Sequence, residues 1–288
     1  MRRVFSAREV EVGTGAAGEG REEVCMALEE KTVTACIMRS FFEDFLRDLE
    51  VDVVIAGAGP SGVTAARYLA QAGVRTVVFE KNLHVGGGMW GGGMLFPRIV
   101  VQEGPNRLLE EVGVRLQEAE DGLYVADSVQ AVACCTAAAI RAGARIWVGM
   151  SVEDLVIRED HRVCGVVLNW TAVEKAGLHV DPLAVSCRLV IDATGHEAQV
   201  CRTLVRKVPG LRLLTRSGEV EGELPMWAER GEEALVDNTR QVHPGLLVAG
   251  MAANAVFGSP RMGAVFGGML LSGKRAAELA VELLRSSK

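Results

Sequence analysis

Short apolar runs alternate with amphipathic stretches through most of the chain. From residue 29 to residue 49, apolar side chains recur every three or four positions, which predicts an amphipathic helix. The β-branched run at 51–56 predicts a buried strand, residues 60–72 a helix that Gly73 ends, and residues 75–79 a second strand. This succession of strand, helix and strand is half of a dinucleotide-binding unit.

The same kind of pattern continues in the second half of the chain. It predicts a helix at 128–142, a final helix near 264–284, and strands at 144–148, 152–157, 163–169, 189–193 and 246–249. Residues 217–233, rich in glycine and glutamate, predict an irregular segment. We expect an α/β, Rossmann-like dinucleotide-binding fold of the two-dinucleotide-domain flavoprotein type, with helices on a mostly parallel sheet and a β-meander insertion.

Length, composition and charge indicate how many domains to expect and which classes of partner to exclude. With 288 residues and 49% apolar side chains, we expect one dinucleotide-binding catalytic domain at 27–288 after a mobile tail at 1–26. A net charge of −6 argues against a nucleic-acid partner, because the phosphate backbone attracts basic surfaces. Apolar stretches such as 131–140 are shorter than the roughly 20 residues needed to span a membrane. Seven cysteines without a C-x-x-C pair predict reduced, mostly buried thiols, and the absence of a secretory pattern predicts a cytoplasmic protein.

A G-x-G-x-x-G motif occupies the turn between the first predicted strand and its helix. Gly57 permits the tight turn, Gly59 lets the backbone approach a pyrophosphate, and Gly62 allows close helix packing. Amides at the helix start favour an anion, and Glu80 at the end of the next strand can accept hydrogen bonds from an adenosine ribose. The alternative, a glycine turn without a ligand, is disfavoured by the combination of strand, helix and acid.

Two further features bear on which nucleotide is bound. Flavoproteins of this type usually carry Gly-Asp at the end of a C-terminal strand, whereas Gly250 is followed here by Met251, which favours an ADP-ribose ligand over intact FAD. The glycine-dense run at 86–94 can lie close against such a ligand. A pair of tight turns between elements is the alternative interpretation of that run.

Candidate metal-binding and substrate-binding side chains lie farther along the chain. His179 and Asp181 are two residues apart before Pro182, and His196 follows an apolar strand. An imidazole and a carboxylate with few other ligands suit Fe(II), Zn(II) or Mn(II), although hydrogen-bonded loop residues would give the same spacing. Arg261 precedes the final helix, where its guanidinium could clamp a carboxylate or simply face solvent.

Two long runs carry a resemblance to a known family. The run GGGMWGGGMLFP at 86–97 and the run GSPRMGAVFGGM at 258–269 closely resemble the thiazole synthase family of thiamine biosynthesis, and the likeness extends from about residue 28 to the end. The resemblance implies a transferase acting on NAD, which condenses NAD with glycine and sulfide to an ADP-thiazole carboxylate and releases nicotinamide. It also implies Fe(II) and a homo-octamer whose sites are shared between subunits.

The family pattern carries over residue by residue. It implies nucleotide contacts from Gly57, Gly59, Ser61, Gly62, Glu80, Lys81, Gly88, Val152, His179, Val180, Asp181 and Met251. Asp181 and His196 match the iron ligands, and Arg261 matches the clamp for the glycine carboxylate. With His179, these three residues form the implied catalytic set.

His179 departs from the eukaryotic pattern of the family. In eukaryotic members a cysteine two residues before the aspartate gives up its sulfur in a single turnover. With histidine at that position, the chain resembles archaeal and some bacterial members and predicts a multiple-turnover enzyme that uses free sulfide. The alternatives are an FAD-dependent oxidoreductase on the same fold and a non-catalytic NAD- or metal-binding protein.

Overall fold

A computed structural model describes residues 28–158 and 161–286. The chain divides into two units, residues 1–44 and 45–288, and the predicted tail at 1–26 lies outside the described residues. Helix α1 (Glu30–Arg47) confirms the first predicted helix and continues from the first unit into the second. Within the second unit, the ring of Phe45 at the end of α1 packs edge-on against Trp147, with 5.3 Å between ring centroids.

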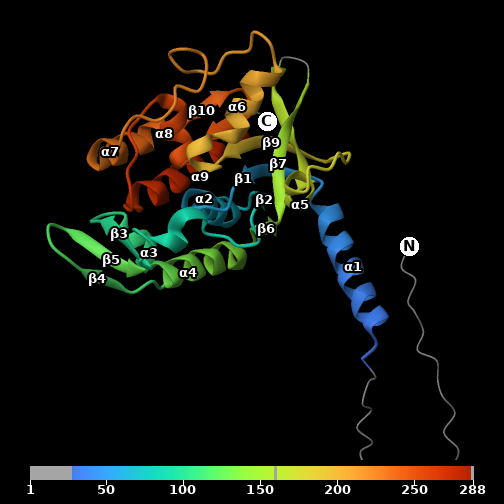
Figure 1. Ribbon diagram of the computed structural model, residues 1–288, viewed down its shortest axis with the longest axis horizontal. Coiled ribbons are helices and arrows are strands. Elements are labelled where there is room, and N and C mark those ends of the chain that lie inside the picture. The colour runs from blue at the N-terminus through green and yellow to red at the C-terminus, as the bar shows by residue number, and fades with distance from the viewer. Residues whose placement is uncertain (1–27, 159–160, 287–288) are drawn as a thin grey trace, which may run out of the picture. The chain divides into compact units, whose positions relative to one another are not determined.

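The larger sheet has a mostly parallel core in the order β10, β11, β9, β1, β2 and β6 (Figure 1). Strand β1 (Glu50–Ala56) pairs in parallel with β2 (Thr76–Glu80) on one side and β9 (Leu183–Asp192) on the other. Strands β6 (Arg145–Val148) and β11 (Leu246–Val248) extend the parallel core, and β10 (Gln241–His243) is antiparallel to β11. The carboxyl ends of β1, β2 and β9 therefore meet at one edge of the sheet, where Ala56 is in register with Phe79 and Asp192.

The meander insertion is present as predicted. Strands β7 (Met150–Ile157) and β8 (Val163–Trp170) form an antiparallel pair, and β8 is also antiparallel to β9. A separate three-stranded sheet was not predicted; it contains β3 (Arg98–Gln102), β4 (Leu116–Glu118) and β5 (Leu123–Asp127). These strands have three to five residues each, so their alternation is too short to stand out in the sequence.

All four predicted helices are present in the structure, but two stretches need correction. Helices α2 (Pro60–Gln71), α4 (Ser128–Arg141) and α9 (Gly267–Ser286) lie where the pattern placed them. The irregular segment at 217–233 was wrong over its last part, because α7 (Ala228–Asn238) begins there, and β9 starts six residues earlier than the strand predicted at 189–193. The other helices in the described part of the chain were not predicted; they are α3 (Asn106–Glu110), α5 (Thr171–Lys175), α6 (Gln199–Lys207), α8 (Met251–Phe257) and the 3-10 turns η1 (Gly87–Gly91) and η3 (Gly195–Glu197).

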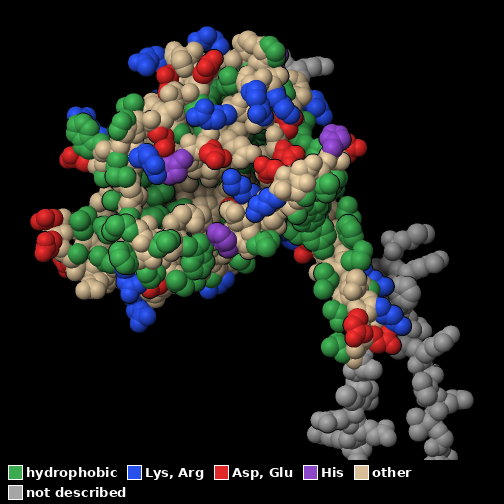
Figure 2. Space-filling view, viewed as in Figure 1, with side chains coloured by type: hydrophobic (Ala, Val, Ile, Leu, Met, Phe, Trp, Pro, Cys, Tyr) green, Lys and Arg blue, Asp and Glu red, His purple; other side chains and the backbone are tan. Residues whose placement is uncertain are grey.

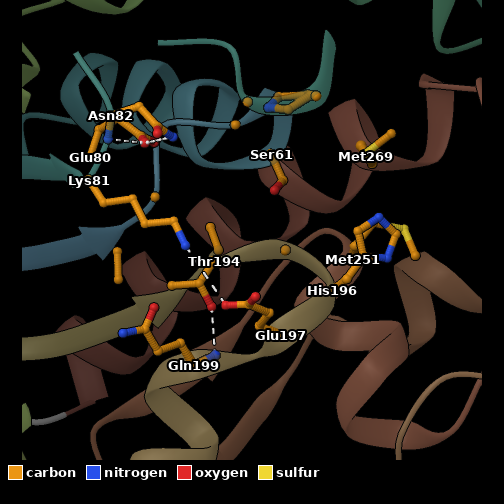
Figure 3. Close-up of a pocket in the computed structure, with 18 of the residues that line it drawn as sticks. Ser61, Glu80, Lys81, Asn82, Thr194, His196, Glu197, Gln199, Met251 and Met269 are labelled. Atoms are coloured by element: carbon orange, nitrogen blue, oxygen red, sulfur yellow. Dashed lines mark hydrogen bonds and ion pairs between the residues drawn. The ribbon is translucent and has the colours of Figure 1, made fainter. Parts of the chain in front are cut away.

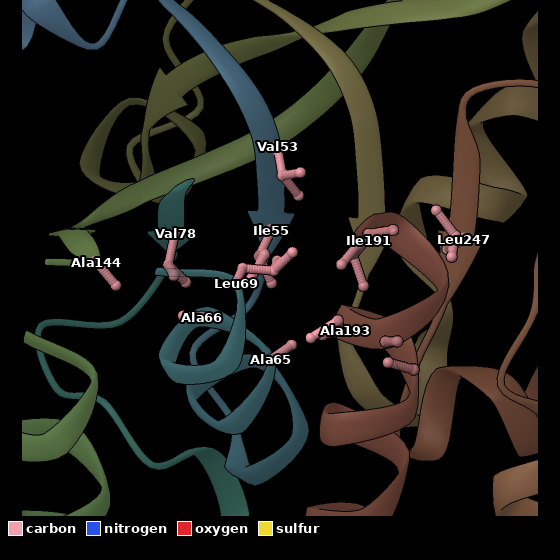
Figure 4. Close-up of a cluster of buried hydrophobic side chains, with 14 of the residues drawn as sticks. Val53, Ile55, Ala65, Ala66, Leu69, Val78, Ala144, Ile191, Ala193 and Leu247 are labelled. Carbon is pink, nitrogen blue, oxygen red and sulfur yellow. The ribbon is translucent and has the colours of Figure 1, made fainter. Parts of the chain in front are cut away.

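The hydrophobic core lies between the parallel strands and the helices α2 and α9 (Figure 4). The sheet contributes Val53, Ile55, Val78, Ile191 and Leu247, and the helices contribute Ala65, Ala66, Leu69, Ala276 and Ala280. Gly273 of α9 sits so close to α2 that an added Cβ would lie 2.3 Å from the Ser61 carbonyl oxygen. This contact ties the start of α2 to α9, and the start of α2 is where the glycine motif ends.

The structure bears on the predicted burial of the cysteines and on the expected lack of a membrane span. Among the described cysteines, which are free thiols, only Cys187 and Cys201 are buried, so "mostly buried" was wrong. Burial raises the pKa of the Cys187 thiol to about 12. No helix in the described part of the chain is long and apolar enough to cross a membrane.

A buried carboxyl joins β3, α7 and α9. Oε2 of Glu232 accepts hydrogen bonds from Gln102 Nε2 at 2.8 Å and from the Gly268 amide at 2.7 Å. The other oxygen of Glu232 and the Gln102 carbonyl oxygen are both buried and lack a hydrogen-bond partner among the described residues. Burial raises the pKa of Glu232, so the fold favours its neutral form.

Glu232→Gln should stabilise the fold at neutral and higher pH. A carboxyl whose pKa is raised on folding contributes stability below its unfolded pKa, and that stability is lost as the pH rises through the folded pKa. The amide stays neutral and can donate to Gln102, so the free energy of unfolding should rise by about 1 kcal/mol at pH 8 and much less at pH 4. Urea unfolding between pH 4 and pH 8 measures the change in the free energy of unfolding, and Glu233→Gln, at the exposed neighbouring position, is the control. A gain of equal size at every pH would contradict the raised pKa of Glu232.

Candidate functional site

A cavity of about 800 Å³ lies at the carboxyl ends of β1, β2 and β9 (Figure 3). This is the edge at which doubly wound sheets collect their ligands, and the volume is in the range that holds a nucleotide-sized molecule. The predicted site residues that line it are Gly57, Gly59, Ser61, Glu80, Lys81, Gly88, Val152, His196, Met251 and Arg261. Side chains separated by up to 204 positions in the sequence therefore converge on one cavity, as the interpretation of the motifs required.

The three motif glycines have the structural roles that their spacing predicts: a tight turn, an open backbone and close helix packing. Gly57 has φ +100°, and an added Cβ would lie 2.5 Å from the Ala193 carbonyl oxygen at the end of β9. Gly62 is buried beneath the turn, where a Cβ would lie 2.0 Å from the Gly57 carbonyl oxygen. Gly59 has no neighbour within 4 Å of that position and lines the cavity, so its backbone is open to a ligand.

Glu80 holds the glycine turn in place. Its carboxylate is 5% exposed; one oxygen accepts a 2.8 Å hydrogen bond from the Ala58 amide, and the other accepts from the backbone and side-chain nitrogens of Asn82. From the sequence, a ribose was the only partner expected for Glu80. The contact with a ribose stays a prediction, and it would use lone pairs that these protein contacts leave over.

The second glycine-rich run lies directly over the first. The Gly86 amide donates a 2.7 Å hydrogen bond to the Ala58 carbonyl oxygen, and an added Cβ on Gly87 would be 3.1 Å from the Gly59 Cα. Gly87, Gly88, Gly92 and Gly93 all line the cavity. The run is therefore part of the cavity wall and not a distant pair of tight turns.

A buried aspartate shapes the loop that carries His196. Asp192, fully buried at the end of β9, accepts hydrogen bonds from the amides of Thr194 and Cys201 and a 2.6 Å bond from the Thr194 hydroxyl. The Thr194 hydroxyl oxygen in turn accepts from the Gln199 amide at 2.8 Å. These bonds fix both ends of η3, so His196 and Glu197 are held at the rim of the cavity (Figure 3).

Several side chains that line the cavity were not predicted from the sequence. They are Asn82, Thr194, Glu197, Gln199, Met226, Phe266 and Met269. Lys81 faces Glu197 across the cavity, with 3.8 Å between Nζ and the carboxylate oxygen. Glu197 directly follows His196 in the strand-end segment, and that position was the only signal that could have indicated it.

The two predicted iron ligands are not brought together at this cavity. His196 lines it, whereas His179, Val180 and Asp181 are exposed on the connection between α5 and β9 and do not line it. No group of three or more His, Cys, Asp or Glu side chains suited to a metal occurs within residues 28–158 and 161–286. His196 itself suits a metal, because its Nδ1 lies 2.6 Å from a Glu223 carboxylate oxygen and this contact leaves Nε2 for a ligand.

Charged side chains at the cavity can meet an anionic ligand. Lys81 and Arg261 both line it. Arg261 Nε also lies 4.0 Å from a carboxylate oxygen of Glu223. On the molecular face shown in Figure 2, lysine, arginine, aspartate and glutamate side chains are intermingled.

Comparison with known proteins places this chain in a family. The model of the Thi4 family matches residues 34–266, which is most of the chain. The chain belongs to the Thi4 family. A thiamine thiazole synthase of Methanothrix thermoacetophila is 55% identical over 91% of this chain and 99% of its own length. One of Pyrococcus horikoshii is 50% identical over 90% of this chain and its entire length.

Solved structures agree with this placement of the Thi4 chain. The crystal structure of THI4 from Thermovibrio ammonificans has a TM-score of 0.86 and 47% identity, and the match covers 90% of this chain and 99% of that one. A geranylgeranyl bacteriochlorophyll reductase-like protein of Thermoplasma acidophilum, at 16% identity and a TM-score of 0.53, covers 83% of this chain and 79% of its own, and shares the fold alone. The predicted Rossmann-like, flavoprotein-type fold is confirmed.

Two glycine substitutions in the motif should have different effects. In Gly62→Ala the new Cβ meets the Gly57 carbonyl oxygen, so the free energy of unfolding should fall by on the order of 2 kcal/mol. In Gly59→Ala the Cβ enters open space, so the change should stay within about 0.5 kcal/mol. Thermal or urea unfolding of both variants without ligand tests this, and equal destabilisation would contradict the roles given to these glycines.

Proposed function

We propose that this protein is a thiamine thiazole synthase that converts NAD, glycine and sulfide to an ADP-thiazole carboxylate and releases nicotinamide. One observation carries the proposal: the glycine-motif cavity is found in a chain that is 50% to 55% identical, over at least 90% of its length, to proteins named thiamine thiazole synthase. The reaction is a transfer from NAD, so NAD is a substrate. The protein acts in the cytoplasm on small molecules, without nucleic acid or membrane.

The ADP-ribose part of NAD would lie along the glycine motif. The amides that begin α2, a helix of 12 residues, favour a pyrophosphate beside Gly57, Gly59 and Ser61. Glu80 and Lys81, at the end of β2, would contact the adenosine ribose and the phosphate charge. Gly88, Val152 and Met251 line the cavity and would contact the rest of the nucleotide, while Gly62 supports the turn from below.

Iron would be held by His196 and Asp181 from neighbouring subunits. His196 lies at the rim of the cavity, and Asp181 is exposed on a connection that does not reach it, so a second copy of the chain would bring the aspartate to the histidine. His179 and Val180 would arrive at the nucleotide on the same segment. This arrangement suits the homo-octamer with shared sites that the family resemblance implies. Fe(II), when bound, supplies Lewis acidity and an open coordination position for sulfide.

Arg261 would bind the carboxylate of glycine. It lies half-exposed at the cavity after α8, where its planar guanidinium can make two parallel hydrogen bonds to a carboxylate. A lysine would offer only a point charge there. The substrate amine would then lie toward the nucleotide, which would occupy the same cavity.

A direct assay tests the multiple-turnover reaction. Purified protein is incubated anaerobically with Fe(II), NAD, glycine and sulfide, and nicotinamide and the adenylated thiazole are followed by mass spectrometry. We expect more than one equivalent of product per chain, and none without added sulfide. Product without added sulfide would contradict the role of His179, and unchanged NAD under every metal would contradict the enzyme itself.

His179→Cys should convert the protein toward single-turnover sulfur donation. The cysteine would stand two residues before Asp181, where eukaryotic members carry their sulfur donor. We expect thiazole formation without added sulfide, up to one equivalent, with conversion of the new cysteine to dehydroalanine seen by intact-protein mass spectrometry. Leu178→Cys, at the exposed adjacent position, is the matched control and should stay unmodified.

A further inference from the structure

We propose that Glu223 is the residue that positions both His196 and Arg261, so that one carboxylate sets the metal ligand and the substrate clamp together. The inference rests on the proposed function for the roles of those two side chains. Glu223 lies in the segment that the sequence pattern marked as irregular, and no motif indicates it. Its importance appears only in the contacts that it makes.

The Glu223 carboxylate bridges the two site residues. Its Oε1 lies 2.6 Å from His196 Nδ1, and its Oε2 lies 4.0 Å from Arg261 Nε. The Glu223 side chain is 15% exposed, whereas those of His196 and Arg261 are 49% and 54% exposed. The carboxylate is thus the fixed member of the group, and the two side chains that face the cavity are arranged around it.

The backbone around Glu223 is held independently of any ligand. The Gly222 amide donates to the Ala255 carbonyl oxygen at 2.9 Å, which ties the segment to α8. On the other side, the Leu224 amide donates to Ser259 at 3.2 Å, and the Arg261 amide donates back to Leu224 at 3.3 Å. Glu223 and Arg261 therefore lie on paired stretches of backbone, and the pairing fixes the position of the carboxylate before substrate or metal binds.

The contact selects one form of the His196 ring. An ionised carboxylate can only accept hydrogen bonds, so Nδ1 must carry the proton that it donates to Glu223. In the neutral ring the lone pair is then on Nε2, the nitrogen left for a metal. A carboxylate at Nδ1 also fixes the ring orientation and increases its strength as a ligand, and loss of such a partner typically weakens metal binding about 10- to 100-fold.

The same carboxylate orients Arg261. Because Glu223 lies on the Nε side of the guanidinium, the two terminal nitrogens stay available for a carboxylate of the substrate. Without Glu223 the arginine would keep its charge and lose its preferred orientation. The expected consequence is a raised KM for glycine, separate from the effect on metal affinity.

Metal affinity of the full-length protein tests the proposal. Co(II), a spectroscopic probe for the Fe(II) site, is titrated into wild type, Glu223→Ala, Glu223→Gln and His196→Ala. Glu223→Ala should weaken Co(II) binding about 10- to 100-fold. Glu223→Gln should weaken it less, because the amide oxygen can still accept from Nδ1. Glu219→Gln, an exposed glutamate in the same segment, is the matched control and should bind as wild type.

Three results would overturn the proposal, and each has a different meaning. Unchanged Co(II) affinity in Glu223→Ala, with loss in His196→Ala, leaves the proposed function standing and removes the role of Glu223. If Glu223→Ala loses Co(II) binding as completely as His196→Ala, Glu223 is itself a metal ligand and not a positioning residue. Unchanged affinity in His196→Ala shows that His196 is not a ligand, so the proposed iron site fails as well. Unfolding midpoints and NAD affinity equal to wild type exclude a general loss of structure.

Discussion

The parallel pairing of β1 between β2 and β9 is the constraint on which the site depends. It aligns Ala56 with Phe79 on one side and Asp192 on the other, so three strands end at the same level. The glycine turn follows β1, Glu80 is the last residue of β2, and the His196 loop follows β9. A shift of one residue in either pairing would turn the next side chains to the opposite faces and separate the parts of the cavity.

Buried polar groups make this arrangement specific. Glu80, at the end of β2, accepts a hydrogen bond from the Ala58 amide in the turn after β1. Asp192, at the end of β9, accepts hydrogen bonds from the amides of Thr194 and Cys201 in the segment after β9. Glu223 plays the same part for side chains, since it contacts His196 and Arg261. These carboxylates thus hold the loops and the side chains that surround the cavity.

The sequence predicted the parts of the fold that have strong, local signals. The apolar β-branched run before Gly57 and the amphipathic helix after it identified the nucleotide-binding unit, and the meander and the four predicted helices are present in the structure. The sheet of β3, β4 and β5 was not predicted because its strands are short. Helix α7 was not predicted because its first half lies in the segment 217–233, whose glycines and glutamates indicated an irregular structure. Glu223 could not be predicted, since its role arises from contacts with residues 27 and 38 positions away.

The central claim is that the cavity receives the ADP-ribose portion of NAD and not a flavin. The most direct measurement is competition binding under anaerobic conditions, with NAD or ADP-ribose titrated calorimetrically into the purified protein in the presence and absence of FAD. The account predicts that ADP-ribose binds with an affinity close to that of NAD, that equimolar FAD does not displace it, and that Gly59→Ala weakens it. Tight FAD binding that displaces ADP-ribose, or a purified protein with flavin absorbance, would contradict the account.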